Sequence, residues 1–114
     1  NTLGWDSCPE GFYEALCWLR EFRKPIFITE NGTCEDDDAF RQKFIQQHLQ
    51  QVQRALDQGL PVIGYLYWSL LDNFEWHQGF GHRFGLIDVD YATFKRTIRP
   101  SGRYLAEVIQ RGRV

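Results

Sequence analysis

Two short apolar runs, at residues 25–29 and 62–68, flank a long amphipathic segment, and this order restricts the fold more than any other feature of the sequence. Each run is rich in β-branched and aromatic residues and is too short for a core helix, so each indicates a buried strand. Between them, apolar residues recur at helical spacing from Phe40 to Leu56 and stop at Gly59. The order strand, helix, strand is typical of a parallel sheet, and we expect an α/β fold whose strands are buried on both faces.

Further helices are expected on either side of this unit. The first opens at Pro9 and carries one apolar stripe: Phe12, Ala15, Leu16, Leu19 and Phe22. The last runs over residues 100–109, after a long aromatic loop at 69–83 and a short extended segment at 84–90. The acidic run 35–38 is interpreted as the solvated start of the long helix, where negative charge is favourable.

Two parallel strands cannot bury themselves, because each needs a neighbour at its edges and helices on its faces. The composition does not reveal this, since 114 residues with 43% hydrophobic and 25% charged side chains match an ordinary domain. We therefore expect other sequence to complete the sheet.

Charge and cysteine usage exclude several classes of function. The net charge is -2 and both signs are interspersed, so nucleic acid is not expected as a partner. No apolar run approaches the roughly 20 residues that span a bilayer, so a membrane is not expected either. The three cysteines follow no metal-ligand spacing and are odd in number, which favours reduced thiols and a cytoplasmic location. We expect no metal or cofactor, because His77 and His82 lack partners at metal spacing, and we interpret His48 as a packed residue of the long helix.

Polar and aromatic side chains follow both predicted strands, at the ends where functional residues of parallel α/β folds lie. Glu30 follows the first strand, Trp68 ends the second, and Glu75 and Trp76 come soon after. A partly shielded carboxylate can act as a nucleophile, and flat rings can stack on sugars. Taken alone, Glu30 could instead cap a helix or pair with an arginine, Trp68 and Phe84 could be core, and Glu75 a solvated loop charge.

A resemblance to a known family favours the functional interpretation of these residues over the structural alternatives. The segment Phe27-Ile28-Thr29-Glu30-Asn31-Gly32 resembles the nucleophile motif of glycoside hydrolase family 1, the retaining β-glucosidases and their relatives. Further segments resemble that family in the same order: Gly4-Trp5, Pro9-Glu10-Gly11, His48-Leu49, Gly64-Tyr65, Trp68 through Trp76, Arg83 through Leu86, Val89-Asp90-Tyr91 and Lys95-Arg96. The resemblance covers nearly the whole chain.

This resemblance implies a role for each candidate residue. Glu30 is the expected nucleophile, Trp68 the aromatic platform under the sugar, and Phe84 an aromatic wall of the same subsite. Glu75 and Trp76 are expected to hydrogen-bond the outer hydroxyls of the sugar. The implied fold is the C-terminal portion of a (β/α)8 TIM barrel, about its last two βα units, so that residues 1–114 form the C-terminal part of a single catalytic domain.

The implied function is retaining hydrolysis of β-glycosidic bonds through a covalent glycosyl-enzyme on Glu30. The family's acid/base glutamate lies in an Asn-Glu-Pro motif that this sequence lacks. The remaining N-terminal part of the barrel, in the same or a companion chain, is therefore an expected partner besides the β-glycoside substrate. The loop after Glu75 lacks the Ser and Lys expected of a phospho-glycosidase, which favours an unphosphorylated glucoside or galactoside. A non-catalytic sugar-binding relative and an inactive barrel fragment remain alternatives.

Overall fold

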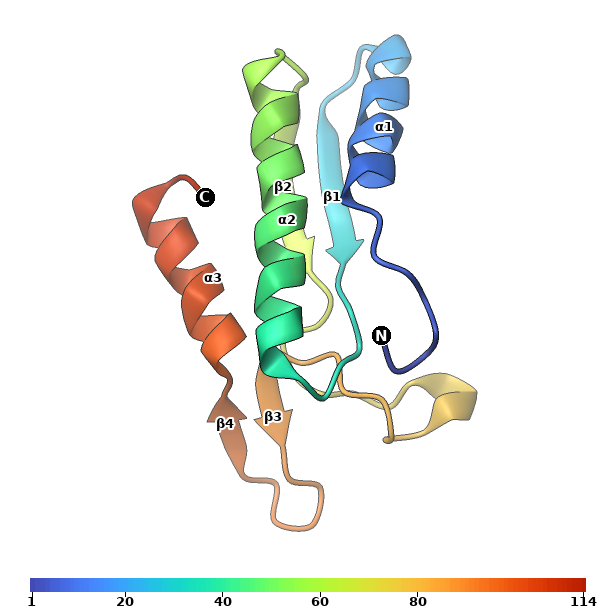
Figure 1. Ribbon diagram of the computed structural model, residues 1–114, viewed down its shortest axis with the longest axis vertical. Coiled ribbons are helices and arrows are strands. Elements are labelled where there is room, and N and C mark those ends of the chain that lie inside the picture. The colour runs from blue at the N-terminus through green and yellow to red at the C-terminus, as the bar shows by residue number, and fades with distance from the viewer.

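The two apolar runs form neighbouring strands at the centre of the computed structural model, which describes residues 1–114. Strand β1 spans Ile26–Asn31 and strand β2 spans Val62–Tyr67, and they pair in parallel. Helix α2, Asp38–Asp57, connects them and runs alongside both in Figure 1. The predicted strand, helix, strand unit is confirmed.

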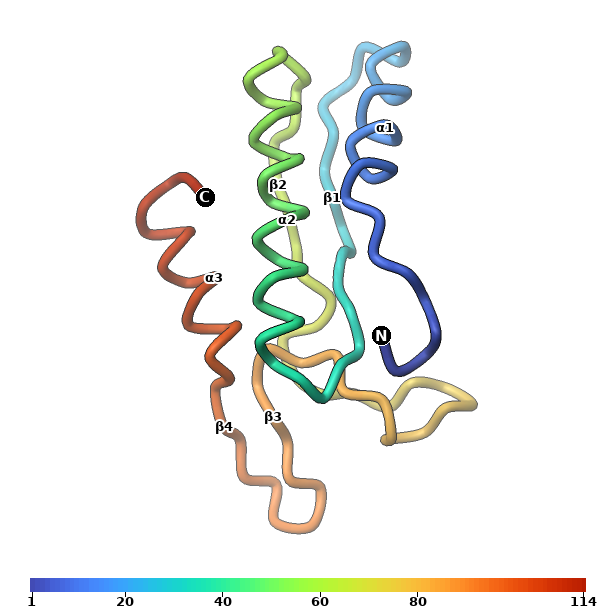
Figure 2. Tube along the Cα trace, viewed as in Figure 1, coloured from blue at the N-terminus to red at the C-terminus, as the bar shows by residue number.

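The remaining elements precede and follow this unit in the sequence, and α1 and α3 lie alongside it in Figure 1. Helix α1 spans Pro9–Leu19 and continues as a 3-10 turn over Arg20–Phe22, and helix α3 spans Pro100–Arg111. Between β2 and α3 lies an antiparallel pair, β3 at Ile87–Val89 and β4 at Arg96–Ile98. Figure 2 shows this hairpin beyond the N-terminal end of α2, reached by the long loop that leaves β2. The extents of 47 × 32 × 21 Å describe a slab whose shortest axis accommodates one helix layer on one strand layer.

The core lies between the helices and one face of the strands. Its main cluster joins α1, β1 and α2 through six buried residues: Leu16, Ile26, Ile28, Val52, Ala55 and Leu60. A second cluster joins α2 to α3 and to the segment before β3: Ile45, Leu49, Leu86 and Val108. His48 is buried and stacks on Phe44 with 3.8 Å between ring centroids, as expected of a packed residue.

The expectation that both strands are buried on both faces is wrong for this chain. Along β1, Ile26 and Ile28 are buried, whereas Phe27 between them is 50% exposed. On β2, Leu66 is exposed on the same face as Phe27, and Ile63 is exposed at an irregularity in the register of the two strands. Successive side chains of a strand point to opposite faces, and α1 and α2 cover only one of these. The apolar content of the open face thus exceeds what residues 1–114 can bury.

The apolar stripe predicted for the first helix is also only partly buried. Leu16 is buried, but Leu19 and Phe22 are exposed. Leu19 is the last residue of α1, and the chain then tightens into the 3-10 turn, so Phe22 leaves the line that faces α2. Together with Phe27 they line an open apolar groove at the outer end of β1.

Asp38 corrects the interpretation of the acidic run as merely solvated. Its Oδ1 accepts hydrogen bonds from Arg41 at 2.6 Å and from the Ser101 hydroxyl at 2.6 Å, and its Oδ2 accepts from the Ser101 N–H at 2.8 Å. Burial would raise the pKa of Asp38, but the hydrogen bonds from Ser101 and Arg41 outweigh it and hold the pKa below its ordinary value. Asp38 therefore ties the start of α2 to the start of α3.

The segment predicted as extended over 84–90 is shorter than expected. Only Ile87–Val89 forms a strand, and its partner β4 was not predicted. The hairpin turn is built by Asp90, whose carboxylate accepts from the N–H of Ala92 at 2.9 Å and from the Thr93 hydroxyl at 2.7 Å. Such local side-chain bonds favour a turn over further strand.

Candidate active site

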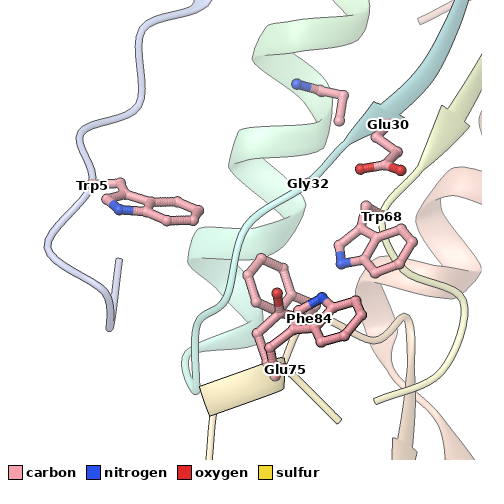
Figure 3. Close-up of a pocket in the computed structure, with 8 residues that line it drawn as sticks. Trp5, Glu30, Gly32, Trp68, Glu75 and Phe84 are labelled. Atoms are coloured by element: carbon pink, nitrogen blue, oxygen red, sulfur yellow. The ribbon is translucent and has the colours of Figure 1, made fainter. Parts of the chain in front are cut away.

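The C-terminal ends of β1 and β2 bring two of the predicted site residues together. Glu30 is the penultimate residue of β1, and Trp68 directly follows β2. The Trp68 N–H donates to the Asn31 carbonyl oxygen at 3.0 Å, which fixes the two strand ends side by side. The Trp68–Ser69 peptide bond is cis. Figure 3 shows Glu30 and Trp68 on the same side of the cavity.

Gly32 permits this close approach of the strand ends. A Cβ atom at position 32 would lie 1.6 Å from the carbonyl oxygen of Trp68. No side chain fits at that distance, so the glycine is required by the path of β2 rather than by its own backbone angles. The spacing between Glu30 and Trp68 thus depends on Gly32.

The neighbouring Asn31 is held from β2. The Tyr65 hydroxyl donates to Asn31 Oδ1 at 2.9 Å. Burial, with a smaller effect from Tyr67, raises the pKa of Tyr65, so its hydroxyl keeps its proton and stays a donor at neutral pH. The strand ends are therefore linked by a side-chain hydrogen bond as well as by the backbone.

An open cavity of about 570 Å³ lies beyond these strand ends. Eight residues line it: Trp5, Glu30, Asn31, Gly32, Trp68, Glu75, Trp76 and Phe84. All five residues predicted from the sequence are among them. Phe84 is buried while Trp68 and Trp76 are exposed, so Phe84 forms part of the cavity floor and of the core at once. Trp5 comes from the segment before α1 and faces the cavity from the other side in Figure 3.

The far wall of the cavity is carried by the loop between β2 and β3. A 3-10 turn over Trp76–Gln78 follows Glu75 in this loop, and the Glu75 N–H donates to the Gly79 carbonyl at 2.7 Å. The carboxylate of Glu75 accepts a hydrogen bond from the Asn73 amide at 2.8 Å. Glu75 and Trp76 are therefore presented by a closed turn.

Asp72 closes the base of this loop. Its buried carboxylate accepts from the Gly85 N–H at 2.9 Å and the Val89 N–H at 3.2 Å. Arg99 binds both oxygens at 3.0 Å, and Arg83 donates at 3.3 Å. Burial would raise the pKa of Asp72, but the hydrogen bonds from Arg99, Gly85 and Val89 and the charge of Arg99 hold it below its ordinary value. One ionised carboxylate thus joins the first residues of the loop to the last.

The chemistry available in the cavity follows from its two carboxylates. Glu30 accepts no hydrogen bond from residues 1–114, so its oxygens are free to attack an electrophile. Glu75 is anchored at one oxygen and can accept from hydroxyls of a ligand. The indole rings of Trp68 and Trp76 offer flat faces to apolar C–H surfaces. The described chain has no cluster of three or more His, Cys, Asp or Glu that could hold a metal ion.

Sequence reasoning missed the residues that support the cavity. Asp72 and Arg99 lie 27 positions apart, and neither spacing nor periodicity connects them. Arg83 and Trp5 were noted only as parts of motifs, although Trp5 lines the cavity. The one available signal was the concentration of polar residues in an aromatic loop directly after a buried strand.

Fold and cavity together define part of a parallel α/β protein whose cleft lies at the carboxyl ends of the strands, where such folds place their functional sites. A sequence profile of the family described as Glycosyl hydrolase family 1 matches residues 1–113, and the chain belongs to that family. No helix is long and apolar enough to cross a membrane.

Individual relatives agree with this assignment. A 1,4-beta-D-glucan glucohydrolase of Thermotoga neapolitana is 43% identical over 96% of this chain and 27% of its own length. A beta-galactosidase of Sulfolobus acidocaldarius is 45% identical over 95% of this chain and 22% of its own. Among solved structures, a beta-glycosidase from Pyrococcus horikoshii superposes with a TM-score of 0.93 at 48% identity, over 95% of this chain and 26% of its own. The chain spans about a quarter of the relatives it matches and corresponds to part of their (β/α)8 barrel.

Proposed function

We propose that this chain supplies the nucleophile and much of the sugar subsite of a retaining β-glycosidase. On this proposal, residues 1–114 are the C-terminal part of a single catalytic domain, about the last two βα units of its barrel. The remaining N-terminal part of the barrel, in the same or a companion chain, completes the sheet and provides the acid/base glutamate. The reducing, cytoplasmic location expected from the odd number of cysteines belongs to the same proposal.

The reaction proceeds in two steps. The Glu30 carboxylate attacks the anomeric carbon of a β-glycoside, and the glycosidic oxygen leaves with a proton from the acid/base residue. The resulting glycosyl ester on Glu30 is then cleaved by water, and the acid/base residue takes the proton of that water. The sugar is released with its β-configuration retained.

The other cavity residues bind the sugar. Trp68 stacks under the ring, and Phe84 closes the subsite as an aromatic wall. The Glu75 carboxylate accepts hydrogen bonds from the outer hydroxyls, and the Trp76 indole N–H donates one. An unphosphorylated glucoside or galactoside fits these partners, since a carboxylate would repel a phosphate.

One observation carries the proposal: Glu30, Trp68, Glu75, Trp76 and Phe84, chosen from the sequence, all line a single cavity at the carboxyl ends of parallel strands. Family membership and the names of the relatives support the same chemistry. A retaining mechanism needs a second carboxyl about 5 Å from the first. The Asn-Glu-Pro motif that carries this group in the family is absent from residues 1–114, so on this proposal the second carboxyl comes from the rest of the barrel.

The test is Glu30→Gly in the assembled enzyme, assayed with an aryl β-glucoside. Turnover is expected to fall by several orders of magnitude, because the attacking anion is gone. Added azide should enter the vacated space, restore part of the rate and give the α-glycosyl azide. Glu21→Gly, at an exposed position of the 3-10 turn after α1, is the matched control and should retain normal turnover.

Two results would contradict the assignment. Near-normal turnover of Glu30→Gly without any added anion would remove Glu30 from the mechanism. Recovery of a β-glycosyl azide would place the lost group on the opposite face of the sugar, where the acid/base residue acts.

A further inference from the structure

A chain of side-chain hydrogen bonds runs from the end of β2 to the carboxylate of Glu75. The Ser69 hydroxyl lies 3.0 Å from Asn73 Oδ1, and the Asn73 Nδ2 amide donates to Glu75 Oε2 at 2.8 Å. The Leu71 carbonyl oxygen lies 2.6 Å from the same hydroxyl and shares its single proton with Asn73 Oδ1. The side chain of Glu75 is thus connected to the same strand end that carries Trp68.

The chemistry of the neighbours fixes the orientation of the Asn73 amide. Reversing it would place Oδ1 against Glu75 Oε2 and also against the Phe74 carbonyl, which Nδ2 now faces at 3.4 Å. Oxygens without a proton repel at such distances, whereas a charge-assisted N–H···O⁻ bond is among the stronger hydrogen bonds in proteins. Asn73 therefore presents its Nδ2 donor to Glu75.

The start of this chain of bonds is rigid. Ser69 is buried, its N–H donates to the Phe84 carbonyl at 3.4 Å, and its carbonyl accepts from the Leu86 N–H at 2.9 Å. At the other end, Oε1 of Glu75 has no partner in residues 1–114 and lines the cavity. One oxygen is held and the other is free for a ligand.

We infer that Asn73 is a positioning residue, which holds Glu75 so that Oε1 meets the outer hydroxyls of the sugar. This inference rests on the proposed function and assigns Asn73 no contact with the substrate. A glutamate side chain has several rotatable bonds, and fixing it before binding removes an ordering penalty from every binding event. Asn73 thus contributes to recognition of those hydroxyls through Glu75 alone.

The experiment compares Asn73→Ala and Asn73→Asp in the assembled enzyme. For an aryl β-glucoside, Asn73→Ala is expected to lower kcat/KM about tenfold, as for loss of a hydrogen bond to a charged group. Asn73→Asp keeps the shape but sets a second carboxylate beside Glu75, and should lower it further. Gln110→Ala is the control, because it removes an exposed side-chain amide of α3 that has no bond to this loop, and should leave kcat/KM unchanged.

Two readouts separate positioning from a general effect on the fold. With substrates that lack the outer hydroxyls, 4-deoxy and 6-deoxy aryl glucosides, Asn73→Ala should cause little loss. In a Glu75→Ala background, replacement of Asn73 should have almost no further effect. Equal losses on the full and the deoxy substrates, or losses that add to those of Glu75→Ala, would overturn the inference.

The proposed function can fail independently. If the unaltered assembled enzyme cleaves β-glycosides and requires Glu30, the function stands whatever Asn73 does. Inactivity of the unaltered enzyme on every β-glycoside would instead refute the function itself, and with it the role of Asn73.

Discussion

Replacing Asp72 by Asn tests whether a buried ion pair closes the loop that carries Glu75 and Trp76. Five N–H donors point at the two oxygens of Asp72. In Asp72→Asn, the side-chain NH2 group would therefore face another N–H donor in either orientation of the amide. The Asp72 side chain is 0% exposed and that of Arg99 is 14% exposed, so the arginine loses a partner where water is scarce. Removing one member of a buried pair typically costs about 3–5 kcal/mol.

The lower end of that range applies here, because Arg99 retains other partners. It donates to Asp88 at 2.7 Å and to the Gly85 carbonyl at 2.6 Å. We expect Asp72→Asn to lower the free energy of unfolding of the assembled enzyme by about 3 kcal/mol, measured as the shift of the urea midpoint at an unchanged slope.

Asp88→Asn is the matched control, since it removes the other carboxylate bound to Arg99. The Asp88 side chain is 48% exposed, so its loss should cost about 0–1 kcal/mol despite the shorter contact. Equal midpoint shifts for the two variants would refute the reasoning that burial, rather than distance, sets the value of these pairs.

The pH dependence of stability gives the same prediction an independent check. The pKa of Asp72 is lower in the folded state than in the unfolded chain, so its ionised form stabilises the fold. That contribution is complete above the ordinary Asp pKa of about 4 and is lost as the pH falls through the lower folded-state value. Asp72→Asn should therefore lose less stability on acidification than the unaltered protein does.

Two further predictions concern the aromatic platform and the open sheet. Trp68→Ala should lower kcat/KM of the assembled enzyme, because it removes a stacking surface that contributes about 1–3 kcal/mol to transition-state binding. Trp18→Ala, on the exposed side of α1, should leave kcat/KM unchanged. An unchanged kcat/KM for Trp68→Ala would make Trp68 only a core residue. The chain alone should associate, or melt without a sharp transition in calorimetry, because Phe27, Ile63 and Leu66 expose apolar surface beside open strand edges. A sharp, concentration-independent transition from a monomer would contradict this.

Local patterns predicted the elements better than their surroundings. The helical period from Phe44 to Val52 reflects a face that α1, β1 and α3 cover, and the structure buries that face. The apolar run of β1 and the last residue of the stripe predicted for the first helix equally indicated burial. Phe27 and Phe22 are nevertheless exposed. Apolar periodicity reports that a face must be covered and does not reveal whether the cover lies in the same 114 residues.

The cavity could be predicted because its residues sit at points that topology fixes. Glu30 and Trp68 end neighbouring parallel strands, and such ends meet at one edge of any parallel sheet. The residues that support the cavity, Asp72 and Arg99, could not be predicted in this way. Whether Arg99 reaches Asp72 depends on the path of the β3–β4 hairpin, and β4 carries no strong strand signal in its sequence, Arg96-Thr97-Ile98.

The two carboxylates of the cavity rest on supports that meet within this chain. Glu30 is carried by β1, whose end is fixed to β2 where Trp68 approaches Gly32. Glu75 is carried by a loop that Asp72 closes and that Asn73 connects to the same end of β2. On the proposed mechanism, the contacts that fix the distance between the attacking group and the hydroxyl-binding group therefore all lie within this chain, once the rest of the barrel covers its open face. The remaining sequence has to complete the sheet and to place the proton donor about 5 Å from Glu30, on the opposite side of the scissile bond.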